Sequence, residues 1–219
     1  MKALKKLMAI ILAVAIMLSV FLIPTSAAPE EKSASDSEKI VRMYIGHRPR
    51  HLNLSGHTWL YFENLTDRDI TVGLYTVKPG KGVSVGSYGY DLEDGRGVYY
   101  NVEAYRYNAA KVNDYLYLST ELTQKQLERV SEKIIVSGTW FYMLNCTFFA
   151  ITTWDVISKP FLMYMVIPVF LYLQIIINPK HDVGFKMYYP KRSEIFKQVG
   201  RGDNAVLEPA NPDSTGTLI

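Results

Sequence analysis

The sequence predicts an α+β fold in which an antiparallel β-sheet packs against helices. Between residues 40 and 118, short segments rich in β-branched and aromatic residues alternate with turn sequences such as PGKG at 79–82. This close spacing of strands and turns is typical of antiparallel sheets. After Thr123 the apolar residues follow a helical period instead. Strands grouped before helices favour the α+β class.

Two helices are expected after the strands. Thr123 and Gln126 have the spacing of a capping box, in which two side chains satisfy the first N–H groups of a helix, and this helix should end at Gly138. A second helix should begin near Cys146 and run through FFAITTWDVI. The expected strands lie at 40–45, 57–63, 70–77, 83–87, 98–107 and 115–118.

The N-terminus has the three parts of a secretory signal peptide. Lysines precede an uninterrupted apolar stretch at 8–23, and small residues follow it. Cleavage is expected after Ala27, which gives a signal peptide over 1–27 and a flexible linker over 28–39. The alternative is an uncleaved N-terminal anchor; a lipoprotein anchor is excluded because no cysteine ends the apolar stretch. The sequence therefore predicts a secreted or cell-surface protein of bacterial type.

The C-terminal part contains an apolar segment that carries no charge. Residues 160–179 are long enough to cross a bilayer, although Pro168 lies within them. Two interpretations remain open: a transmembrane helix that anchors the protein, or a helical insertion that packs on its own domain or lies on a membrane surface. A short helix is expected at 190–199. The expected divisions are a globular domain at 40–159, the apolar segment at 160–179, a basic segment with the short helix at 180–201 and a disordered tail at 202–219.

Composition and motifs exclude several classes of function. The net charge is only +3, and no basic run follows the pattern that binds a phosphate backbone, so no nucleic-acid partner is expected. The sequence has no HExxH motif, cysteine pair or carboxylate cluster with ligand spacing, so neither a metal nor another cofactor is expected. The single cysteine, Cys146, cannot form an internal disulfide and is either an inert buried residue or a reactive thiol. The oligomeric state is left open.

The residues around Cys146 favour a reactive thiol. They place the cysteine at the start of a helix, where unpaired N–H groups and the helix dipole lower the pKa of a thiol. The same N–H groups can hold an oxyanion, so Asn145 and the backbone N–H of Cys146 are candidate oxyanion donors. His57, at the start of a predicted strand, is the candidate general base. A lone histidine is more often an ordinary core or surface residue, so the hypothesis depends on the combination.

Three stretches of the chain together resemble a known superfamily. It is the papain-like cysteine peptidase superfamily in its circularly permuted form, which is shared with lecithin retinol acyltransferase and its bacterial relatives. In those proteins the histidine strand precedes the cysteine helix, as His57 precedes Cys146, and NCTFFA resembles the helix start of small exported members. The resemblance extends over residues 40–157. The three stretches are SGHTWLYFEN at 55–64, LSTELTQKQL at 118–127 and YMLNCTFFAITTW at 142–154.

The resemblance implies a role for each candidate site residue. Cys146 would be the nucleophile, His57 the general base, and Asn145 or the backbone N–H of Cys146 an oxyanion donor. A third residue, which orients the imidazole, usually lies on a following strand in these proteins. Glu103 is the best charged candidate, on the predicted strand VYYNVEAYRY with Asn101 on the same face, although both would also suit a solvated strand.

Three functions remain open. The first is an exported cysteine hydrolase that cleaves an amide bond in cell-wall peptide or another envelope substrate. The second is an acyl-transfer enzyme that acts on lipid, which the apolar segment at 160–179 favours. The third is a non-catalytic envelope binding module with the same fold, which the absence of an evident third residue favours. The three differ in the chemistry expected at Cys146.

Overall fold

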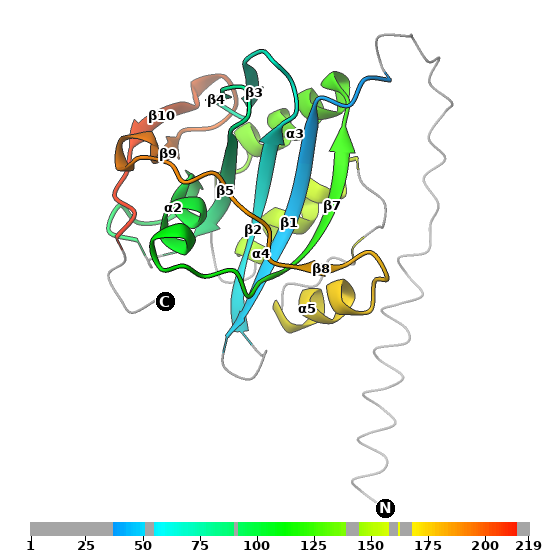
Figure 1. The fold of residues 1–219 in the computed structure, drawn as a ribbon. Helices are drawn as coiled ribbons and strands as arrows, with labels where there is room; N and C mark the ends of the chain where they lie inside the picture. The colour runs from blue at the N-terminus through cyan, green and yellow to red at the C-terminus, as the bar shows by residue number, and fades with distance from the viewer. Residues whose placement is uncertain are drawn as a thin grey trace, which may run out of the picture. The chain divides into compact units, whose positions relative to one another are not determined.

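The structure of the chain is a large antiparallel sheet with helices on both faces (Figure 1). The described residues contain four α-helices, and every strand pair in the sheet is antiparallel. The predicted α+β class is therefore confirmed. The predicted signal peptide, 1–27, lies outside the described residues. The structure, a computed structural model, describes residues 37–50, 55–89, 92–138, 145–157, 162 and 168–213.

The two long central strands organise the sheet. β1 and β2 pair along their whole length, from Val41 opposite Asn64 to Arg50 opposite Ser55. The strand order is β10-β9-β6-β5-β2-β1-β7-β8, and β3 and β4 form a separate hairpin. The strands are β1 (Val41–Arg50), β2 (Ser55–Asn64), β3 (Ile70–Val72), β4 (Tyr75–Val77), β5 (Gly82–Tyr88), β6 (Gly97–Tyr100), β7 (Leu116–Leu122), β8 (Asp182–Val183), β9 (Phe196–Val199) and β10 (Val206–Pro209).

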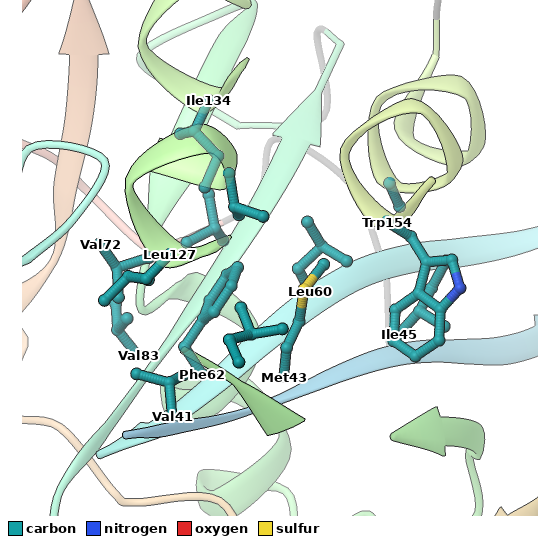
Figure 2. Packing of buried hydrophobic residues seen from close by; sticks show 14 of the residues in the cluster. Val41, Met43, Ile45, Leu60, Phe62, Val72, Val83, Leu127, Ile134 and Trp154 are labelled. Atoms are coloured by element: carbon teal, nitrogen blue, oxygen red, sulfur yellow. The ribbon is translucent and has the colours of Figure 1, made fainter. Parts of the chain in front are cut away.

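Each face of the central strands has its own hydrophobic core, because successive side chains of a strand point to opposite faces. One face, the α4 face, is covered by α3 (Gln124–Val136), α4 (Cys146–Trp154) and α5 (Pro168–Ile176). Figure 2 shows side chains of α3 and α4 over the strand residues of this face. The other face, the α2 face, is covered by α2 (Val102–Ala109) and is rich in aromatic rings such as Trp59 and Tyr61.

The predicted strand at 98–107 is wrong in its second half. β6 ends at Tyr100 and α2 begins at Val102, so Glu103 lies in the first turn of a helix. Asn101 between them has a φ of 68°, in the left-handed region that asparagine tolerates better than most residues. Its side-chain amide donates to the carbonyl of Glu194 at 2.8 Å, which holds this sharp change of direction. The aromatic and β-branched composition of the segment could not reveal this turn.

The C-terminal segments also differ from the sequence prediction. Instead of a helix at 190–199, a short 3₁₀ turn at Arg192–Glu194 leads into β9. β9 pairs with the edge of β6, and β10 then pairs with β9, so part of the tail predicted to be disordered extends the sheet. Pairing with an open sheet edge outweighs the local helical preference here.

The described end of the apolar segment packs on its own domain. In α5, Leu171 and Ile175 are fully buried in the α4-face core, whereas Leu173 and Ile176 are exposed. No helix among the residues that the structure describes is long and apolar enough to cross a membrane. The rest of the segment, apart from Leu162, lies outside these residues.

The turn of the β3–β4 hairpin gives a testable prediction about stability. Gly73 has a φ of 57°, and a Cβ there would lie 2.3 Å from the Tyr100 hydroxyl. Gly80 has a φ of 66° with no atom within 4 Å of its Cβ position. We expect Gly80→Ala to lower the free energy of unfolding by about 1–2 kcal/mol, the cost of the left-handed backbone alone. Gly73→Ala should cost about 1–3 kcal/mol more, because it adds a steric clash. Urea denaturation measures the free energy of unfolding of both variants. Equal losses would contradict the proposed clash between a Cβ at Gly73 and the Tyr100 hydroxyl.

Candidate active site

The start of α4 fixes the backbone around Cys146. The side chain of Asn145 accepts hydrogen bonds from the N–H groups of Thr147 at 3.0 Å and Phe148 at 3.2 Å, which makes it the helix N-cap. The carbonyl of Asn145 accepts from the N–H of Phe149 at 3.0 Å. Cys146 therefore occupies the first position of the helix, where the residue is partly exposed and its N–H has no carbonyl partner within the helix. The side chain of Asn145, a candidate oxyanion donor from the sequence, therefore caps α4 in the structure.

The sulfur of Cys146 lies where the ladder between β2 and β5 ends. The last pair of that ladder is Trp59 opposite Gly86. Beyond it, the backbone N–H of Thr58 donates to Cys146 instead of to β5. Cys146 begins a helix on the α4 face, whereas the imidazole of His57 points to the α2 face, like Trp59 two residues further on. The end of the ladder allows these two side chains, from opposite faces of the sheet, to form a hydrogen bond.

Glu103 holds the other side of the imidazole. Its Oε1 lies 2.8 Å from Nε2 of His57, which leaves Nδ1 as the ring nitrogen for the thiol. Its Oε2 accepts a hydrogen bond from the Ser84 hydroxyl at 2.8 Å, and the Tyr88 hydroxyl also bonds to this carboxylate. The Glu103 side chain is fully buried, while 22% of the His57 side chain is exposed. The structure therefore places Glu103, the third candidate from the sequence, against His57, although from a helix and not from a strand.

The electrostatics of the site favour a thiolate beside an imidazolium. Burial raises the pKa of Cys146, but the charge and hydrogen bond of His57, with the donors from Thr58 and Thr147, outweigh it and lower that pKa overall. Burial lowers the pKa of His57, but Cys146 and Glu103 outweigh it and raise the pKa of His57 to about 10. A lowered cysteine pKa beside a raised histidine pKa favours the thiolate–imidazolium form of this pair.

Comparisons with family models, with curated proteins and with solved structures each find no match. The proposed function of the chain therefore depends on the geometry around Cys146.

Several residues of the site were not identified from the sequence. On β5, Ser84, Gly86 and Tyr88 alternate toward the α2 face and surround Glu103. A Cβ on Gly86 would lie 1.8 Å from Oε1 of Glu103, so the carboxylate needs a glycine at this point. The period-two spacing of these residues was visible in the sequence, but nothing there indicated that a helix would place a carboxylate against them.

Two cavities lie near the site without including Cys146 or His57 in their linings. One, of about 420 Å³, is lined by Tyr107, Lys111 and Phe185 among others. Tyr107 packs edge-on against Trp59 at 4.9 Å, and Trp59 stacks on His57 at 6.0 Å, so this cavity lies two rings from the imidazole. The other, of about 200 Å³, is lined in part by residues of α4. Within the described ranges, no group of three or more His, Cys, Asp or Glu residues could hold a metal ion.

Proposed function

We propose that the chain is an exported cysteine hydrolase that cleaves an amide bond, with a permuted papain-like arrangement of its site. The observation that carries the proposal is that His57 contacts both Cys146 and a buried carboxylate, Glu103. A nucleophile, a base in contact with it and a third group that orients the base form the minimal set for covalent acyl transfer. The signal-like N-terminus supports an envelope peptide as substrate.

The geometry suggests a two-step reaction. The thiolate of Cys146 attacks the carbonyl carbon, and the backbone N–H of Cys146 stabilises the oxyanion that forms. The proton on Nδ1 of His57 passes to the amide nitrogen, so the amine leaves and a thioester remains on the sulfur. His57, now neutral, takes a proton from water, which attacks the thioester. The acid is released, and the thiolate and imidazolium are restored.

The pH dependence of thiol alkylation tests the ion pair directly. Only the thiolate reacts with iodoacetamide, and a lowered pKa keeps Cys146 ionised at a pH where an ordinary thiol is protonated. At about pH 6 we expect the folded protein to react at least about 10-fold faster than the urea-denatured chain. The rate should rise as pH increases through the lowered pKa of Cys146, whereas hydrolysis should fall above about pH 10, as His57 loses its proton.

The control for this experiment is His57→Gln, which removes the imidazolium. Its thiol should need a higher pH for the same alkylation rate, since the largest influence that lowers the pKa of Cys146 is gone. Equal rates for folded and denatured wild-type protein at about pH 6 would contradict the hydrolase proposal. They would favour a binding module with an ordinary buried cysteine.

A second candidate, acyl transfer on lipid, is favoured by the outer surface of α5. Leu173 and Ile176 are exposed on α5 and Ile177 is exposed directly after its end, and clusters of exposed apolar residues are typical of membrane or partner contacts. The same thiolate would accept an acyl chain and pass it to an amine instead of water. The products distinguish the two functions: a hydrolase releases free acid from peptide or lipid, whereas a transferase gives an amide when an amine acceptor is present.

A further inference from the structure

A chain of buried hydrogen bonds reaches the sulfur from the α4 face. Nδ1 of His47 lies 3.0 Å from the Thr58 hydroxyl, which lies 3.1 Å from the Thr147 hydroxyl. The Thr147 side chain in turn hydrogen-bonds to Cys146. His47, Thr58 and Thr147 are each fully buried. We propose that His47 is a positioning residue that acts through the hydroxyls of Thr58 and Thr147 to orient and stabilise the Cys146 thiolate.

The number of protons available determines which group donates in each of these hydrogen bonds. Each hydroxyl has one proton to donate, and a thiolate can only accept. If Thr147 donates to the sulfur, it must accept a hydrogen bond from Thr58, and the hydroxyl of Thr58 must then accept a hydrogen bond from His47. The N–H of His47 is therefore on Nδ1, and Nε2 carries a lone pair. The opposite direction would aim oxygen lone pairs at the negative sulfur.

The surroundings of Nε2 agree with this assignment. Nε2 of His47 is buried, and no hydrogen-bond partner reaches it from the described residues. A buried N–H without an acceptor is rarer and more costly in proteins than a buried lone pair without a donor. The backbone of Gly56 closes over this edge of the ring, since a Cβ there would lie 3.1 Å from Nε2, and the ring of Tyr172 on α5 lies 6.2 Å away.

His47 remains neutral at neutral pH. Burial, together with the charge of His57, lowers the pKa of His47 to about 4. Among the described residues, the titratable groups that face it are His57 on β2 and Tyr172 on α5. Cys146 on α4 is separated from it by the hydroxyls of Thr58 and Thr147. A neutral ring has one donor and one acceptor, so it can fix the polarity of the chain, whereas a charged ring would donate from both nitrogens.

The two sides of the sheet therefore act on one sulfur in different ways. The α2 face supplies the imidazolium of His57, which exchanges protons with substrate. The α4 face supplies a fixed hydroxyl donor from Thr147, held by His47, which exchanges none. This inference rests on the proposed nucleophilic role of Cys146, but alkylation measures the thiolate without any substrate.

The test uses the pH profile of Cys146 alkylation in the purified full chain. His47→Leu removes the terminal donor, and Thr147→Val removes the final hydroxyl while leaving His47 in place. Because a hydrogen bond to a charged group is lost, the lower inflection of the profile should move up by about one pH unit in each variant. His47→Asn, whose amide nitrogen can occupy the place of Nδ1, should restore most of the wild-type profile.

The matched control is Thr153→Val, on the same helix. Its hydroxyl is also buried but donates to the carbonyl of Phe149 at 2.8 Å, so its removal should leave the profile unchanged. If the wild-type inflection of the alkylation profile is low but does not move in Thr147→Val, the role of these hydrogen bonds is overturned. The hydrolase proposal would still stand. A shift in Thr147→Val that is absent in folded His47→Leu would overturn the role of His47. If the wild-type inflection instead lies at the pH expected for an ordinary thiol, the proposed function itself is contradicted.

Discussion

Hydrolysis should fall by at least about 10⁴-fold when Cys146 is replaced by alanine, because the chain has no second thiol that could take its place. Alanine suits the first position of a helix, and the cap from Asn145 does not depend on the sulfur. The loss should therefore appear in kcat with little change in the thermal midpoint. Purified protein with and without the substitution, assayed on the same peptide mixture, measures it.

The same variant reports how strongly the two charges are coupled. Without the sulfur, His57 loses the largest influence that raises its pKa and keeps only the contribution of Glu103. We expect the pKa of His57 to fall from about 10 toward its ordinary range, which NMR titration of the ring protons can follow. Thr152→Ala on the same helix is a suitable control. Its hydroxyl donates to the carbonyl of Phe149 at 3.2 Å, so the substitution should alter neither kcat nor the histidine pKa. Turnover that survives Cys146→Ala would contradict the nucleophilic role.

The sequence was informative about the cysteine because the relevant signals are local. Helix-capping residues act within one turn: the capping box of Thr123 occurs in the structure as predicted, and α4 begins at Cys146, where a helix was expected. The order of His57 and Cys146 along the chain is also visible without coordinates. What the sequence could not show is where the β2–β5 ladder stops, since the length of a ladder depends on both strands and on what lies between them.

Glu103 illustrates the same limit from the opposite side. The sequence indicated this residue as the third candidate, but on a strand, because aromatic and β-branched neighbours favour extended structure. The turn at Asn101 depends on a contact with Glu194, more than ninety residues away in the chain. Likewise, only the pairing of β1 with β2 places His47 opposite Thr58. Contacts between residues far apart in the chain therefore determine which side chains face the site.

Gly86→Ala should disrupt the site without removing any of its functional groups. The added methyl would lie 1.8 Å from Oε1 of Glu103, and Oε1 is the atom that bonds to His57. The carboxylate cannot swing freely, because it is fully buried and its other oxygen is held by Ser84. The bond to His57 should therefore break. No left-handed φ is involved at Gly86, so backbone strain does not contribute.

We expect kcat to fall by about 10²–10⁴-fold in Gly86→Ala, the usual range when a general acid–base group loses its orientation. The pKa of His57 should fall as well, because the contact with Glu103 helps to raise it. Gly82→Ala is a close control on the same strand and face. Its methyl would meet the Tyr61 hydroxyl at 2.1 Å, so it should lower the free energy of unfolding while leaving the pKa of His57 unchanged.

A double-mutant cycle separates loss of orientation from general damage. In a Glu103→Ala background the carboxylate is absent, so the methyl of Gly86→Ala loses its clash with Oε1 and retains a 3.2 Å approach to the Tyr88 ring. It should then cost little further activity. The two substitutions should therefore be strongly non-additive in kcat. If their effects on kcat simply add, the methyl acts elsewhere, and the bond between Glu103 and His57 is not what orients the imidazole.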